Sequence, residues 1–103
     1  MKNLSDHEII EANLIVVLDE MERQNEIEET YLPGELSYGD EMAQIREFIE
    51  IAGEYGLAYE YINCALERHS YKISGKAAIK LLEVGLLMGF KSGRENDKRF
   101  DGR

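Results

Sequence analysis

Apolar residues near the start of the chain recur with helical spacing and predict a helix over about residues 6–25. Ser5 and Glu8 have the three-residue spacing of a capping box, in which each side chain hydrogen-bonds the backbone N–H of the other residue. The apolar positions that follow share one helical face: Ile10, Leu14, Val17, Leu18 and Met21. The acidic positions lie opposite: Glu8, Glu11, Asp19 and Glu22. We therefore expect this helix to bury one face and expose the other.

A loop and a second helix are expected next. Residues 26–36 contain the turn pair Pro33 and Gly34, so we predict a loop there. Ser37 is positioned to cap the following helix, and acidic residues near its start favour the positive N-terminal end. Gly53 is expected to end this helix. Its expected inner stripe is Met42, Ile45, Ile49 and Ala52, with Phe48 beside them.

Two further helices are predicted, over about residues 54–68 and 75–90, the second capped by Ser74. The third helix has the apolar face Ala58, Tyr61, Ile62, Ala65 and Leu66. For the fourth we expect the core face Ala78, Leu81, Leu82, Gly85, Met88 and Gly89, with Ile79, Val84 and Leu86 widening it. A helix that is apolar nearly all round is usually central. The two glycines suggest a close approach between helices, which would offset their low helix propensity.

These patterns predict an all-α fold, a compact bundle of about four main helices. The chain has 103 residues, the size of one domain. We expect the domain to cover residues 1–90. Residues 91–103 carry eight charged side chains and one apolar residue, so we expect a charged C-terminal tail.

Negative charge is concentrated in the first half of the chain. The sequence has 12 basic and 21 acidic residues, a net charge of -9. Residues 1–50 hold 14 acids and 3 bases, whereas residues 51–90 hold 4 of each. A negative surface repels phosphates, which argues against a nucleic-acid partner and favours a basic one. The alternative is that the acidic residues only keep a small protein soluble.

No catalytic or metal-binding pattern stands out. His7, Cys64 and His69 lack the spacing of metal ligands. Cys64 and His69 would lie about 140° apart on a helix and so would not share a face. A lone cysteine fits a reducing compartment. The chain also lacks a signal-peptide stretch and an apolar run of the roughly 20 residues that span a bilayer. We therefore expect a cytoplasmic protein that is not an enzyme and has no cofactor, metal or membrane contact.

The expected partner-binding surface combines the acidic stretch around residues 19–29, the tyrosines of the following loop and the start of the second helix. Its predicted members are Asp19, Glu22, Glu26, Glu28, Glu29, Tyr31, Glu35, Tyr38, Asp40 and Glu41. Like charges at this density repel one another, and a basic partner would relieve that repulsion. Tyrosine is a common interface anchor. The alternative is a solvated acidic face with tyrosines that pack on their own core.

Short patterns at the helix boundaries resemble one known family. They are Leu-Pro-Gly-Glu-Leu-Ser at residues 32–37, Gly-Glu-Tyr-Gly-Leu-Ala at 53–58, Ile-Ser at 73–74 and Gly-Leu-Leu-Met-Gly-Phe at 85–90. In this order they resemble the MafI-type immunity proteins of bacterial polymorphic toxin systems, over about 60 of the 103 residues.

The resemblance implies an α-helical protein that is encoded beside a toxin and neutralises it. Its relatives protect against ribonuclease toxins, including EndoU-like ones, and occur with contact-dependent growth inhibition systems. The implied partner is the basic nuclease domain at the C-terminus of a cognate toxin, and the family has no catalytic residues to carry over. The alternative function is a helical adaptor or regulatory protein with no toxin partner, which could be a homodimer. The sequence leaves the oligomeric state open.

Overall fold

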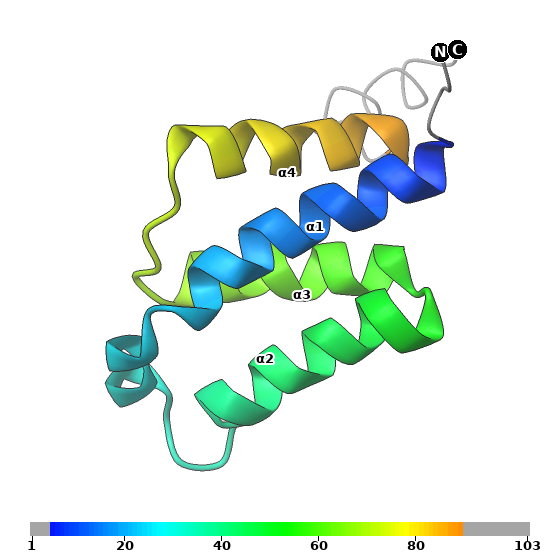
Figure 1. The fold of residues 1–103 in the computed structure, drawn as a ribbon. Coiled ribbons are helices and arrows are strands. Elements are labelled where there is room, and N and C mark those ends of the chain that lie inside the picture. Colours follow the sequence, from blue (N-terminus) through cyan, green and yellow to red (C-terminus); the bar gives the residue numbers. More distant parts are fainter. Residues whose placement is uncertain (1–4, 90–103) are drawn as a thin grey trace, which may run out of the picture.

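The computed structural model describes residues 5–89 and forms an all-α bundle with four main helices (Figure 1), which confirms the predicted fold class. The main helices are α1 (Asp6–Glu22), α2 (Tyr38–Glu47), α3 (Tyr55–Arg68) and α4 (Gly75–Leu87). A 3-10 helix, η1 (Asn25–Thr30), follows α1, and a π-helical turn, η2 (Phe48–Ala52), extends α2. The predicted tail at 91–103 lies outside the described residues. Within residues 5–89, no helix is both long enough and apolar enough to cross a membrane.

The central helix of the bundle is α1, which corrects our prediction that the fourth helix is central. In Figure 1, α1 runs between α4 on one side and α2 and α3 on the other. Its predicted stripe is buried in full, and Ile15 and Val16 on its flanks pack against the same core. Because its apolar residues extend beyond one face, α1 can contact neighbours on both sides.

The buried face of α4 differs from the predicted one. Ala77, Leu81, Val84 and Gly85 are buried, whereas Ala78 and Leu82 of the predicted core face are exposed. A helix that is apolar nearly all round does not reveal its orientation by its pattern alone. In the observed orientation, α4 forms polar contacts with α1: Asn13 Nδ2 donates to the Lys80 carbonyl at 3.2 Å and to Glu83 Oε1 at 2.8 Å.

The helix ends follow the capping prediction closely. The side chains of Ser5, Ser37 and Ser74 each accept a hydrogen bond from the backbone N–H three residues later, and Ser5 forms the complete capping box with Glu8. Gly53 ends η2 with φ of 65°, in the left-handed region that favours glycine.

The predictions for Gly89 and Ala52, that both lie on inner helix faces, need correction. Gly89 follows the end of α4 with φ of 81° and has open space around it, so it terminates the helix and does not permit a close approach. Ala52 is exposed because the π-helical turn changes the rotation of the residues that follow Phe48.

The segment after α1 is also more ordered than the predicted loop. The α-helix ends at Glu22 rather than at residue 25, and the 3-10 helix η1 follows. Ile27, an apolar residue among acids, is 6% exposed and anchors η1 to the bundle. Gln24 Nε2 donates to the carbonyl of Lys72 at 2.6 Å, and Gln24 Oε1 accepts from the Lys72 N–H at 2.8 Å. These two bonds tie the end of α1 to the link between α3 and α4.

Candidate functional site

Four of the predicted contact residues present free carboxylates to solvent. Glu26, Glu28 and Glu29 are exposed on η1, and Asp40 is exposed in the first turn of α2. Among the described residues, none of the four forms an ion pair. We call these four residues the acidic surface. They are the part of the predicted site that a partner can reach without breaking contacts within the protein.

Asp19 and Glu22 are engaged with an arginine of α2 rather than free. Arg46 Nη2 lies 2.8 Å from Asp19 Oδ1 and 2.7 Å from Glu22 Oε1, and Arg46 Nη1 lies 2.6 Å from Glu50 Oε2. The hydrogen bond to Glu22 is the largest of the effects that raise the pKa of Arg46. Arg46 therefore relieves part of the expected charge repulsion within the fold, although it was not among the predicted partner-binding residues.

Tyr38 and Glu41, two of the residues predicted to face a partner, are buried. Tyr38 is 8% exposed and donates its hydroxyl proton to the Met21 carbonyl at 2.9 Å, close to the end of α1. Burial raises the pKa of its hydroxyl. Glu41 is 5% exposed, and its Oε1 accepts a hydrogen bond from Tyr31 at 2.6 Å. Tyr38 therefore reaches the end of α1, whereas Glu41 reaches the loop that carries Tyr31.

Tyr31 joins the loop to the segment before α4. Its hydroxyl lies 2.7 Å from that of Tyr71, and because its one proton goes to Glu41, Tyr71 must donate to it. Burial is the main cause that raises the pKa of Tyr31, and burial also raises the pKa of Tyr71 to about 12. Both hydroxyls therefore stay protonated at neutral pH, and the chain from Tyr71 through Tyr31 to Glu41 keeps one direction.

His69 is a buried polar residue beside this chain. Its ring stacks on Tyr31 with a centroid distance of 3.7 Å and an interplanar angle of 6°. Thr30 Oγ1 donates to the Ile27 carbonyl, so it accepts from His69 Nδ1–H at 2.6 Å. His69 Nε2 is buried without a hydrogen bond among the described residues, and it lies 4.0 Å from Glu35 Oε1. Cys64, in α3, is exposed.

Glu35 anchors the loop to α3. Its carboxylate accepts from the backbone N–H of Leu32 and pairs with the guanidinium of Arg68. The Leu32 hydrogen bond, with support from Arg68, holds the pKa of Glu35 below its usual value. This predicted contact residue is therefore also engaged within the fold.

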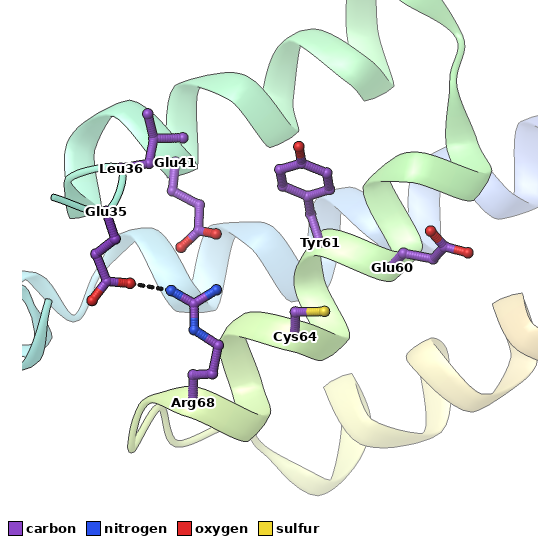
Figure 2. A pocket seen from close by; sticks show the side chains of 7 residues that line it. All are labelled: Glu35, Leu36, Glu41, Glu60, Tyr61, Cys64 and Arg68. Atoms are coloured by element: carbon purple, nitrogen blue, oxygen red, sulfur yellow. Dashed lines mark hydrogen bonds and ion pairs between the residues drawn. The ribbon is translucent and has the colours of Figure 1, made fainter. Parts of the chain in front are cut away.

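A pocket of about 350 Å³ opens between the loop, α2 and α3 (Figure 2). Its lining combines acidic, apolar and basic side chains: Glu35, Leu36, Glu41, Glu60, Tyr61, Cys64 and Arg68. Figure 2 shows Glu35, Glu41 and Arg68 near one end of the pocket. Glu60 lies at the other end, toward the start of α3 and on the far side of Tyr61. We call this the α3 pocket. The predicted partner-binding residues include two acids of this pocket, Glu35 and Glu41, but none of the four residues that α3 contributes.

In residues 5–89 no group of three or more histidine, cysteine, aspartate or glutamate side chains is placed to hold a metal ion. Thr30 forms a hydrogen bond with His69 at 2.6 Å, but its hydroxyl proton goes to the Ile27 carbonyl and not to the histidine that would activate a nucleophile.

Comparison with known proteins gives no assignment. No protein-family model matches the chain, and no curated protein or solved structure matches it. The resemblance to MafI-type immunity proteins therefore stays a prediction from the sequence.

Proposed function

We propose that this protein is a cytoplasmic immunity protein that binds and neutralises a cognate toxin, a ribonuclease of a contact-dependent growth inhibition system. The observation that supports the proposal is the acidic surface. Its four carboxylates lie on η1 and the first turn of α2, and no cation pairs with them among the described residues.

The charge of the acidic surface matches what a ribonuclease offers. An enzyme that binds RNA phosphates carries a basic groove, and a surface of opposite potential is attracted to it. Complementary charges raise the association rate and fix the orientation of the partners. The acidic surface can act either inside the groove, where it would mimic phosphates, or on a basic region beside it. In both modes the protein works by occupying a surface and needs neither catalysis nor a cofactor.

The test is survival of cells that express the toxin encoded next to this protein. The wild-type protein should restore growth, and the triple variant Glu26→Lys, Glu28→Lys, Glu29→Lys should not. We leave Glu22 out of the triple because it holds Arg46. The matched control reverses three other exposed glutamates on α2, before α3 and on α3: Glu47→Lys, Glu54→Lys and Glu67→Lys. This control carries the same charge change and should protect fully.

Two results would contradict the proposal at different levels. Full protection by the triple variant would show that the acidic surface is not the interface. Failure of the wild-type protein to bind or block any neighbouring toxin would leave the adaptor function as the better hypothesis.

One observation favours that second candidate, an adaptor or regulatory protein that could be a homodimer. The outward face of α4 is apolar, with Ile79 68% exposed, Leu82 62% and Leu86 53%. Contiguous exposed apolar surface commonly marks an interaction site. If the adaptor hypothesis is right, Leu82→Glu should abolish self-association in sedimentation or partner capture, while the acidic triple variant should have no effect on either.

A further inference from the structure

We propose that the α3 pocket receives an arginine side chain of the protein partner, with the guanidinium at the buried carboxylate of Glu41. This inference rests on the proposed function, since it names the partner chemistry that the immunity protein would recognise. Three features of the pocket support this assignment: its size, its unbalanced charge and the buried carboxylate of Glu41.

The size and lining of the pocket suit one long side chain. Binding pockets for drug-sized molecules start at about 300 Å³, so a volume of about 350 Å³ lies at the lower end of that range. Leu36, Tyr61 and Cys64 provide an apolar lining along which methylene groups can lie. Tyr61 is 36% exposed, and its ring gives a face on which a cation can stack.

The pocket has more negative than positive charge. Its lining holds three carboxylates and one guanidinium, and Arg68 is already paired with Glu35. Glu41 and Glu60 therefore have no cation among the described residues. An added guanidinium would balance part of this charge.

Glu41 gives the strongest indication of a missing cation. Only 5% of the residue is exposed, and Tyr31 is the one hydrogen-bond donor to its side chain within residues 5–89. Charged side chains are rarely buried to this degree unless they are paired, because a carboxylate loses its hydration on burial. The directed chain from Tyr71 through Tyr31 holds Oε1 in place, so an incoming cation would meet a fixed carboxylate.

Arginine fits this arrangement better than lysine. A guanidinium is planar, donates to two acceptors in fixed directions and stacks on an aromatic ring. It is also more weakly hydrated than an ammonium, so it loses less on entering a half-enclosed pocket.

The experiment is a titration followed by ¹H–¹⁵N NMR, with Nα-acetyl-arginine amide as the probe. Amide shifts of Leu36, Tyr61 and Cys64 should change and saturate, with a Kd on the order of 1–10 mM. Nα-acetyl-lysine amide should bind more weakly, and the neutral isostere Nα-acetyl-citrulline amide should not bind. Glu41→Gln should weaken arginine binding by about tenfold. Asp40→Asn makes the same charge change one residue earlier, outside the pocket, and should bind as the wild type does.

The buried position of Glu41 means that Glu41→Gln could unfold the protein, so Glu60→Gln provides a second variant. Because Glu60 is exposed, its replacement should leave the fold intact. It should also weaken arginine binding. The proposal is overturned if the wild type shows no saturable shifts up to about 100 mM probe, if citrulline binds as well as arginine, or if Glu60→Gln and any folded Glu41→Gln protein bind unchanged.

The titration contains no toxin, so a negative result refutes the pocket assignment without testing the immunity function. A protein that neutralises a toxin but binds no arginine would refute the pocket assignment alone. A protein that binds arginine but no neighbouring toxin would support the pocket and refute the immunity function.

Discussion

Removing the hydroxyl of Tyr31 tests the polar network that connects the loop, α2 and the segment before α4. In Tyr31→Phe the ring remains and can keep its stacking on His69, which has a centroid distance of 3.7 Å. The change deletes the hydrogen bond to Glu41 at 2.6 Å and leaves the Tyr71 hydroxyl without its acceptor at 2.7 Å. The variant therefore isolates two hydrogen bonds with little change in packing.

The expected loss of stability follows from the kind of hydrogen bond removed. A hydrogen bond to a charged group contributes about 1.5–3 kcal/mol and a neutral one about 1 kcal/mol. Water can reach Glu41 from the α3 pocket and replace part of the first bond, so we expect a net loss of about 2 kcal/mol. In a domain of this size, that loss lowers the melting temperature by about 8–16 °C.

The assay is urea and thermal unfolding followed by far-ultraviolet circular dichroism at neutral pH. Tyr71→Phe removes only the donor to Tyr31, so it should cost about 1 kcal/mol, less than Tyr31→Phe. A loss below about 0.5 kcal/mol in Tyr31→Phe, or a larger loss in Tyr71→Phe, would refute the directed chain.

Three other perturbations test the packing, the ion pairs and the pH dependence. Leu14→Ala leaves a cavity beneath α1, where Leu14 is fully buried, and should lower the free energy of unfolding in urea by about 2–5 kcal/mol. Arg46→Met removes the shared partner of three half-exposed carboxylates, so it should cost about 1 kcal/mol at low salt, and measurably less as salt rises. Hydrogen bonds from the backbone N–H and the hydroxyl of Ser74 lower the pKa of Glu20 from 4.5, so the stability it contributes is complete above about pH 4.5 and lost as pH falls through the lower folded pKa. Glu20→Gln should therefore be less stable than wild type at pH 7, and unfolding measured from pH 7 to pH 3 should show the difference shrinking; a constant difference would contradict this assignment.

Local signals in the sequence located the helix starts well. Ser5, Ser37 and Ser74 cap helices because a hydroxyl and the following turn are all that the interaction needs. The orientation of α4 could not be read in the same way, because apolar residues surround it and the observed contacts come from Asn13, which lies 67 residues before Lys80. Tertiary packing decided between faces that the sequence pattern made equivalent.

The candidate site shows the same division. The sequence indicated where acidic residues gather, but their exposure depends on partners that are distant in the chain. Arg46, which pairs with Glu22, lies 24 residues further along the chain, and His69, which stacks on Tyr31, follows the end of α3. The α3 pocket could not be predicted because it forms only when α3 packs beside the loop and α2.

The most direct test of the proposed function is the association rate of the purified protein with the nuclease domain of the neighbouring toxin, measured across a range of salt concentrations. We expect a one-to-one complex that blocks RNA cleavage, with an association rate that falls as salt screens the charges. The triple reversal of Glu26, Glu28 and Glu29 should associate more slowly at low salt, whereas the control triple should match the wild type. An absence of binding would contradict the immunity function, and a salt-independent rate that the triple reversal leaves unchanged would contradict the role of the acidic surface.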